Sequence, residues 1–257
     1  MSARTIPSRR LQLVDRALQL LSSGSSPVEP EAAALDDLLP DGAICFDVGA
    51  EYGLYTLTFA RRIGIDGRVF SFEPLPGPHR FLSEVVRWLR APNVTVHRLA
   101  LGDRVREATL SLPKRRWFPV HGRAFVTDDA HGPGPNEEFA DEERVSTTVS
   151  TIDTAVAEAG LQRVDFIKID VEGYEPAVLR GATRTLERFR PTLLIEIEDR
   201  HLEKFLATSA TVIDQLAPYG YRMAALSDGA WRPVETVSTR ARNYLFTAPR
   251  TRGAGSP

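Results

Sequence analysis

Apolar residues along the chain alternate between short continuous runs and longer stretches in which they recur at helical spacing. Runs such as AICFDV and FIKID end in an acid, which is typical of strands buried on both faces of a sheet. Helical stripes separate these runs, so the order of elements indicates a parallel sheet with helices on both faces. Seven strands are predicted on this basis, at 43–48, 67–74, 93–103, 164–173, 191–198, 221–226 and 243–248.

Three segments depart from this alternation and set the expected domain organisation. Residues 1–40 combine an amphipathic stripe in LQLVDRALQLL with the linker SSGSSPVEP, so we expect an N-terminal helical extension. The main domain is then expected over residues 41–250. Within it, residues 114–148 are rich in Pro, Gly and acids, which predicts an inserted irregular loop acting as a lid over an acceptor. Residues 251–257 are expected to form a disordered tail.

The composition is that of an ordinary globular protein and narrows the classes of partner. In 257 residues the net charge is -2, which gives no bias toward nucleic acid or an anionic membrane. No apolar stretch is long enough to span a bilayer, and an Asp and an Arg interrupt the N-terminal apolar segment, so a cytoplasmic location is expected. The single cysteine, Cys45, excludes an intrachain disulfide. A homodimer through the N-terminal helix is an arrangement that the sequence allows.

Most polar residues at the predicted strand ends are acidic. Open parallel sheets bind ligands outside the carboxyl ends of their strands, so these residues are candidates for one site. They are Asp47, Gly49, Glu51 and Gly53 after the first strand, Glu73 after the second, Ala100 and Leu101 at the third, Asp170, Glu172 and Glu175 after the fourth, and Glu196, Glu198 and His201 at the fifth.

The turn after the first strand favours a cofactor that carries positive charge and no phosphate. It reads FDVGAEYGLYT, lacks the G-x-G-x-x-G spacing of a dinucleotide site, and contains Glu51, which would repel a pyrophosphate. S-adenosylmethionine fits better, because its sulfonium and ammonium groups suit Asp47 and Glu51 and its carboxylate can accept backbone N–H groups. Glu73 is placed to accept both ribose hydroxyls. The alternatives are an NAD(P)-dependent oxidoreductase and a catalytically inactive binding module with the same fold.

The chain resembles the FkbM-type family of S-adenosylmethionine-dependent methyltransferases over roughly residues 43–201. The resemblance is carried, in order, by FDVGAEYGLYT, FEP, LALGD, STIDT, FIKIDVEGYEPAVLRGA and LLIEIEDRH. It implies the class I methyltransferase fold, which is Rossmann-like and doubly wound, with a mostly parallel seven-stranded sheet and a final antiparallel strand. It also implies O-methylation of a sugar, glycolipid or polyketide-type natural product. The family usually has Asn where this chain has Glu51, which either contacts the methionine end or points to solvent.

Methyl transfer to a hydroxyl requires help in removing its proton, from a general base or a metal. Strand alternation directs Asp170 and Glu172 to one side, and an imidazole can accept a proton near neutral pH, so the predicted catalytic residues are Asp170, Glu172 and His201. In the alternative interpretation, acids here, Glu175 among them, cap the following helix. A divalent metal such as Mg²⁺ is a second candidate ligand, held by Asp170, Glu196 and His201.

Further residues complete the expected site. Lys168, inside a buried strand, is expected to pair with one of the acids. Trp117, Phe118 and Phe125 in the insert either stack on the acceptor or anchor the loop, and His121 is a weaker candidate for contact with the acceptor. The acceptor is expected to be a small molecule or glycan with a free hydroxyl. The predicted S-adenosylmethionine site comprises Asp47, Gly49, Glu51, Gly53, Tyr55, Thr56, Glu73, Ala100, Leu101 and Asp170.

Overall fold

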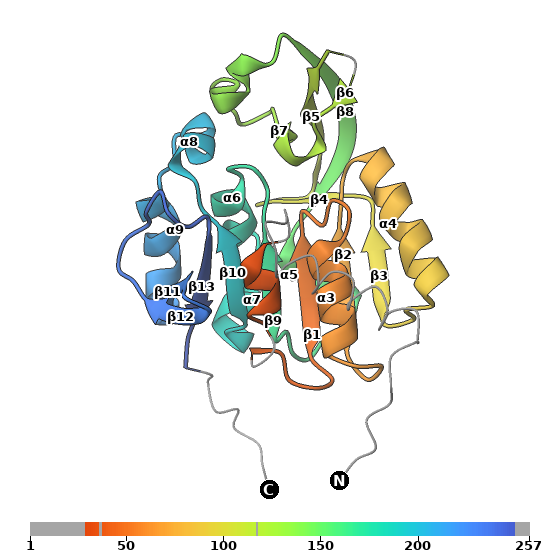
Figure 1. Ribbon diagram of the computed structural model, residues 1–257, viewed down its shortest axis with the longest axis vertical. Helices are drawn as coiled ribbons and strands as arrows, with labels where there is room; N and C mark the ends of the chain where they lie inside the picture. The colour runs from red at the N-terminus through yellow and green to blue at the C-terminus, as the bar shows by residue number, and fades with distance from the viewer. Residues whose placement is uncertain (1–28, 36–37, 117, 250–257) are drawn as a thin grey trace, which may run out of the picture.

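The computed structural model of the protein describes residues 29–35, 38–116 and 118–249. The predicted helix over LQLVDRALQLL, Trp117 and the predicted tail lie outside these residues. Eight strands form the main sheet, side by side in Figure 1. They are β1 (Ile44–Val48), β2 (Arg68–Phe72), β3 (Val94–His97), β9 (Phe166–Ile169), β10 (Thr192–Glu196), β11 (Arg222–Ser227), β12 (Ala230–Pro233) and β13 (Asn243–Thr247).

The order of strands across this sheet is β12-β11-β13-β10-β9-β1-β2-β3. β13 runs antiparallel to both β10 and β11, and β12 pairs antiparallel with β11, while the other neighbours are parallel. The predicted doubly wound, mostly parallel sheet with a final antiparallel strand is confirmed. β12 adds an eighth strand to the seven predicted. The direction of winding reverses between β1 and β9, which is where open sheets of this kind bind ligands.

Helices cover both faces of the sheet, and strand alternation explains why. Phe46 and Val48 of β1 belong to one buried apolar cluster, and Cys45, directly before Phe46, belongs to the other. The first cluster includes residues of five helices, α5 (Ile152–Glu158), α6 (Glu175–Arg180), α7 (Thr183–Phe189), α8 (Asp199–Leu202) and α9 (Ser209–Leu216). The second includes residues of α2 (Pro30–Ala33), α3 (Leu54–Arg62) and α4 (Pro76–Leu89). Ala32, Leu35 and Leu39 therefore pack on the main domain.

A second, smaller sheet stands above the carboxyl ends of the main strands (Figure 1). Its strands are β4 (Ala100–Leu101), β5 (Arg106–Arg115), β6 (Phe118–Pro119), β7 (Phe125–Val126) and β8 (Asp141–Ser150). Short 3-10 turns η2 (His121–Arg123) and η3 (Gly134–Glu138) lie between them. The expectation of an irregular loop over 114–148 was therefore wrong in part. β8 reads DEERVSTTVS and has no apolar run, and its pairing partner β5 is remote in sequence, so its pattern does not predict a strand.

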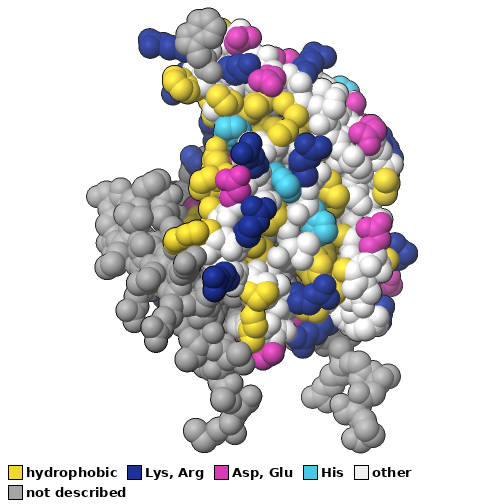
Figure 2. All heavy atoms as spheres, turned by 90° about the vertical axis from the view of Figure 1, so that its right-hand side faces the viewer, with side chains coloured by type: hydrophobic (Ala, Val, Ile, Leu, Met, Phe, Trp, Pro, Cys, Tyr) yellow, Lys and Arg dark blue, Asp and Glu magenta, His cyan; other side chains and the backbone are white. Residues whose placement is uncertain are grey.

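The predicted third strand divides between the two sheets. β3 ends at His97 in the main sheet, and β4 pairs with β8 in the small sheet, so Ala100 and Leu101 connect the two. Figure 2 views the α4 side, where basic, acidic and apolar side chains are interspersed over the surface. Among the described residues, no helix has the length and apolar character required to cross a membrane.

Candidate active site

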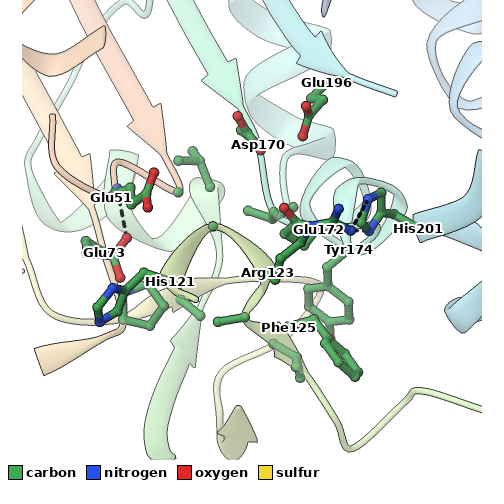
Figure 3. Close-up of a pocket in the computed structure, with 18 of the residues that line it drawn as sticks. Glu51, Glu73, His121, Arg123, Phe125, Asp170, Glu172, Tyr174, Glu196 and His201 are labelled. Carbon is green, nitrogen blue, oxygen red and sulfur yellow. Dashed lines mark hydrogen bonds and ion pairs between the residues drawn. The ribbon is translucent and has the colours of Figure 1, made fainter. Parts of the chain in front are cut away.

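A cavity of about 250 Å³ lies at the carboxyl ends of the main strands, beneath the small sheet (Figure 3). It opens at the reversal point between β1 and β9, as the topology requires. The structure brings nine predicted site residues to its wall. They are Gly49, Glu51, Glu73, Ala100, Leu101, Asp170, Glu172, Glu196 and His201.

The turn after β1 requires its glycines. Gly49 has φ +82, and a Cβ there would collide with the carbonyl oxygen of Asp170. Gly53 caps α3 with φ +90, and a Cβ there would collide with Leu82. Glu51, between them, also has a positive φ, of 43, and its carboxylate lies at the cavity rather than in solvent. Burial and then the charges of Asp170, Glu172 and Glu29 raise the pKa of Glu51, so this part of the wall is crowded with carboxylates.

The backbone N–H groups of this turn already have partners. Gly49 and Ala50 donate to the carbonyl oxygen of Phe72, at 3.0 Å each, and the N–H of Glu51 donates to Oε2 of Glu73 at 2.9 Å. These donors are therefore engaged, unlike the expectation that they receive a cofactor carboxylate. The other carboxylate oxygen of Glu73 accepts from Leu75 N–H at 2.7 Å. Burial raises the pKa of Glu73 to about 7.

Four predicted cofactor residues lie behind the wall instead of on it: Asp47, Gly53, Tyr55 and Thr56. Asp47 is 2% exposed and accepts from Thr56 Oγ1 at 2.5 Å, and burial raises its pKa to about 6. The hydroxyl of Tyr55 donates to Glu29 at 2.6 Å. These side chains lie on the buried faces of β1 and α3, so they hold the turn in place from behind and do not reach the cavity.

Asp170 and Glu196 follow the paired residues Ile169 and Ile195 of neighbouring strands and lie near one another at the cavity (Figure 3). A hydrogen bond between their carboxyl groups affects the pKa of both. Burial, and then the charge of Asp170, raise the pKa of Glu196 far above its ordinary range, so Glu196 carries the proton of this pair. Burial opposes ionisation of Asp170, but Lys168 and the Glu196 hydrogen bond hold the pKa of Asp170 below its ordinary value. Lys168 Nζ lies 3.2 Å from Asp170, which confirms the expected pairing, and donates to Asn243 at 2.8 Å.

The predicted metal ligands do not assemble. Within the described ranges, no group of three or more His, Cys, Asp or Glu side chains has an arrangement that could hold a metal ion. Each predicted ligand has another partner: Asp170 pairs with Lys168, Glu196 hydrogen-bonds Asp170, and His201 pairs with Glu172.

Glu172 and His201 form a pair at the opposite wall. His201 is 3% exposed, and its Nδ1 lies 2.8 Å from Glu172 Oε2. Its Nε2 lies 3.4 Å from a guanidinium nitrogen of Arg123 in the insert. Strand alternation does not place Glu172, because β9 ends at Ile169 and Glu172 has a left-handed φ of 56. The turn after β9, and not the strand, brings this carboxylate to the imidazole.

Glu175 has a structural role. Its Oε1 accepts the backbone N–H groups of Val171 and Gly173, each at 3.1 Å, at the start of α6. This supports the interpretation that it caps the helix. Burial raises the pKa of Glu175 to about 7.

The insert supplies residues that the sequence pattern did not single out. Arg123 and Gly122 of η2 line the cavity, and His121 Nδ1 lies 2.9 Å from the Tyr52 hydroxyl, which joins the insert to the turn after β1. Phe125 is buried at the cavity, whereas Phe118 is 76% exposed. The basic residue in the fragment VHGRAF was the available signal for Arg123.

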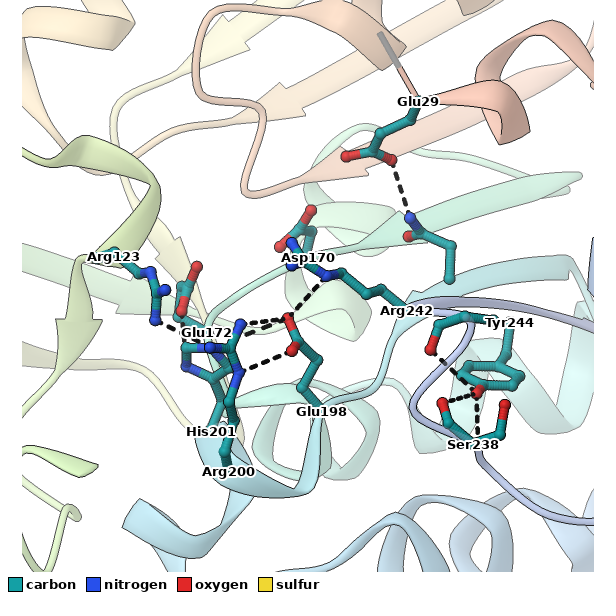
Figure 4. Close-up of polar contacts among 12 residues, drawn as sticks. Glu29, Arg123, Asp170, Glu172, Glu198, Arg200, His201, Ser238, Arg242 and Tyr244 are labelled. Atoms are coloured by element: carbon teal, nitrogen blue, oxygen red, sulfur yellow. Dashed lines mark hydrogen bonds and ion pairs between the residues drawn. The ribbon is translucent and has the colours of Figure 1, made fainter. Parts of the chain in front are cut away.

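Tyr174, Glu198, Arg200 and Arg242 also line the cavity, and only Glu198 was among the strand-end acids singled out from the sequence. Tyr174 donates to Asp129 at 2.9 Å and accepts from an arginine of β5 at 3.0 Å, which ties the insert to the turn after β9. Arg200 donates to both carboxylate oxygens of Glu198, at 2.7 and 3.0 Å, and Arg242 lies 3.6 Å from the same group (Figure 4). These side chains meet only in the folded chain.

The chain is similar to several known proteins. Residues 47–223 match the family model described as the methyltransferase FkbM domain. The chain is 26% identical over 220 residues to the AMB antimetabolite synthetase AmbE of Pseudomonas aeruginosa, covering 74% of this chain and 10% of that protein. It is also 26% identical over 150 residues to Methyltransferase 1 of Beauveria bassiana, covering 55% of this chain and 59% of that protein. The chain thus spans about a tenth of the first relative and under two thirds of the second.

The chain is also similar to solved structures. Methyltransferase FkbM from Methylobacillus flagellatus has a TM-score of 0.49 at 16% identity, covering 91% of this chain and 58% of that one. The O-methyltransferase from Bacillus cereus, in complex with SAH, has a TM-score of 0.44 at 12% identity, covering 92% of this chain and 89% of that one.

Proposed function

The chain belongs to the FkbM family of methyltransferases, and from this we propose that it transfers the methyl group of S-adenosylmethionine to a hydroxyl oxygen of a small-molecule or glycan acceptor. S-adenosylmethionine, when bound, supplies an electrophilic methyl group on a sulfonium cation. The residues around the turn after β1 fit such a cation, because carboxylates crowd there: burial, and then the charges of the neighbouring acids, raise the pKa of Glu51. A cationic ligand would relieve that repulsion, whereas a phosphate would increase it.

The roles of the acidic residues follow from their positions. Glu51 and the shared pair of Asp170 and Glu196 face the middle of the cavity, so we assign them to the ammonium and sulfonium end of the cofactor. Glu73 retains unused acceptor capacity on both oxygens after its two backbone contacts, and we assign it to the ribose hydroxyls.

The observation that carries O-methylation is the pair of Glu172 and His201. Nδ1 lies 2.8 Å from a Glu172 carboxylate oxygen and 3.3 Å from the Lys204 ammonium; with the carboxylate as its partner, we infer that Nδ1 carries the proton and that Nε2 keeps its lone pair. Nε2 faces Arg123 at the cavity. We infer that Nε2 removes the proton of the acceptor hydroxyl, and that Glu172 orients the ring and stabilises the imidazolium that forms.

Calorimetry with the demethylated cofactor tests the cofactor assignment. We expect S-adenosylhomocysteine to bind and NADH not to bind. Absence of binding by both S-adenosylmethionine and S-adenosylhomocysteine would contradict the methyltransferase proposal. An NADH complex would favour the oxidoreductase alternative.

Turnover of His201→Ala tests the base. With a panel of glycosides and hydroxylated macrolides as acceptors, we expect the variant to lose about 10²–10⁴-fold in kcat. Its affinity for S-adenosylhomocysteine should stay within about threefold of wild type, because the imidazole acts on the acceptor. His131→Ala, an exposed histidine of the same insert, is the matched control and should keep full activity. A wild-type rate in His201→Ala would remove the base role.

A further inference from the structure

The cations near the cavity gather at one end, where they lie among two acids, Glu172 and Glu198, whereas the charged side chains that line the other end are all acids. The end formed by the turn after β1 and the ends of β9 and β10 is acidic, and its carboxyl groups belong to Glu29, Glu51, Glu73, Asp170 and Glu196. The other end is formed by η2, the first turns after β10 and the approach to β13. It carries most of the cations near the cavity, which are Arg123, Arg200, Lys204 and Arg242.

Two of these cations have a carboxylate partner, and the third, Lys204, is 2% exposed and does not line the cavity. Arg200 and Arg242 both contact Glu198. Lys204 lies 4.3 Å above the Phe125 ring and 3.3 Å from His201 Nδ1. Each is therefore held by the fold itself.

Arg123 differs from them. It lines the cavity in a half-buried position, and its guanidinium contacts His201 Nε2 at 3.4 Å. In residues 29–35, 38–116 and 118–249, no carboxylate lies within ion-pair distance of it. A guanidinium has five N–H donors in a planar fork that matches a carboxylate or phosphate, and partial burial without such a partner is costly.

We propose that the acceptor carries a carboxylate or a phosphate, and that Arg123 binds this anion. The proposal rests on the methyltransferase function proposed above, and it narrows the acceptor to an anionic hydroxyl compound. Nε2 of His201 is 3.4 Å from Arg123, so an anion on the guanidinium places a nearby hydroxyl of the same molecule beside the base. The anion also draws the Arg123 N–H away from Nε2 and leaves that lone pair for the hydroxyl.

A carboxylate can also come from the cofactor, through the methionine group. The turn N–H groups of Gly49, Ala50 and Glu51 are already engaged, so that carboxylate needs another partner. We favour the acceptor as the source, because the Arg123 guanidinium contacts His201, the proposed base, while the contact of η2 with the turn after β1 is made by His121. The affinity for S-adenosylhomocysteine separates the two sources.

The test uses the full chain and probe pairs that differ in charge. With the protein saturated in S-adenosylhomocysteine, binding is measured for glucuronate and glucose 6-phosphate against glucose, and for 3-hydroxybutyrate against 1,3-butanediol. We expect the charged member of at least one pair to bind about tenfold more tightly than the neutral one. Arg123→Gln should abolish that preference, and Arg123→Lys should retain part of it, because the charge remains without the planar fork.

Arg116→Gln is the matched control. Arg116 is an exposed arginine of the same insert and does not line the cavity, so the preference should survive. Thermal melting of each variant checks that it is folded. The proposal is overturned if wild type binds each of the three charged probes no more tightly than its neutral counterpart, or binds none of them. It is also overturned if a preference for the charged probe persists in Arg123→Gln.

The outcomes separate this proposal from the methyltransferase function. If Arg123→Gln weakens S-adenosylhomocysteine by about tenfold or more, the guanidinium binds the cofactor carboxylate, and the acceptor assignment is wrong. If wild type does not bind S-adenosylhomocysteine at all, the methyltransferase function itself fails. If that affinity is normal and no probe shows a charge preference, only the anionic acceptor is refuted.

Discussion

Burial sets the protonation of several carboxyl groups behind and beside the cavity. It raises the pKa of Asp47 to about 6 and the pKa values of Glu73 and Glu175 to about 7. In each case hydrogen bonds from nearby donors work in the opposite direction. For Glu175 these donors are the backbone N–H groups of the turn after β9, so the same residue shapes the turn that carries Glu172.

Glu175 is expected to make the free energy of unfolding depend on pH. Because the pKa of Glu175 is about 7 in the folded protein against an ordinary 4.5, the folded state binds the proton more tightly than the unfolded chain. The free energy of unfolding therefore falls as pH rises from about 4.5 to about 7. We expect Glu175→Gln to remove up to about 3 kcal/mol of this fall, measured by urea unfolding at pH 5 and pH 8.

The matched control for this prediction is Glu187→Gln, an exposed position on α7. Its pH dependence should follow wild type. An identical pH dependence in Glu175→Gln and wild type would show that Glu175 does not carry the effect.

At the scale of elements, the cavity depends on two turns that touch. The turn after β1 approaches the turn after β9 so closely that Gly49 has no room for a Cβ beside the Asp170 carbonyl. Parallel pairing of β1 with β9, with Val48 opposite Ile169, brings the two turns to the same level. The acids of both turns therefore share one wall.

Substituting alanine for Gly49 and, as a control, for Gly64 tests how closely the turns after β1 and β9 approach each other. Gly49 and Gly64 both have positive φ values, +82 and +72, but the space around Gly64 is open within 4 Å. We expect Gly64→Ala to lose about 1–2 kcal/mol of unfolding free energy from backbone strain alone. Gly49→Ala should lose about 1–3 kcal/mol more, from overpacking, and should also weaken S-adenosylhomocysteine binding. Chemical denaturation of both variants checks this, and equal losses would contradict the close approach.

At the scale of the whole molecule, the cavity lies between the carboxyl ends of the main strands and the small sheet, and we propose that the cofactor binds against the main strands while η2 of the small sheet faces the acceptor. The small sheet is rooted by β4, by an apolar cluster that includes Leu110 and Ala177, and by the hydrogen bonds of Tyr174. Its tip, η2, then lies over the turn after β1 through the contact of His121 with Tyr52. The insert is thus an ordered element that covers the cavity and is anchored to the main domain at its base.

Removing residues 116–140, which include η2, should lower methyl transfer much more than it lowers cofactor binding. Replacing residues 116–140 with a short Asn-Gly turn joins β5 to β8 directly, where Lys114 already pairs with Asp141. We expect S-adenosylhomocysteine affinity within about tenfold of wild type, because the acidic wall is intact. Methyl transfer should fall about 100-fold or more, because the acceptor loses the residues that orient it. Loss of cofactor binding in a variant that melts cooperatively would show that the tip belongs to the cofactor site.

Several features of the fold and site were accessible from sequence because they depend on neighbours along the chain. The buried strands are continuous apolar runs, and Gly49 and Gly53 mark a turn that needs positive φ. The predicted pairing of Lys168 with an acid is confirmed by Asp170, two residues away. β8 escaped prediction because its stability comes from pairing with β5 rather than from its own apolar pattern.

The sequence by itself determined that acids would gather at the strand ends around a glycine turn, since strand direction and backbone sterics are local properties. Only the tertiary structure decided which of them face the cavity and which, like Asp47 and Glu175, lie buried behind it. It also brought Arg123 to His201 across 78 residues of chain. The physical reason is that burial and charge pairing depend on contacts between segments far apart in sequence, which the order of residues does not specify.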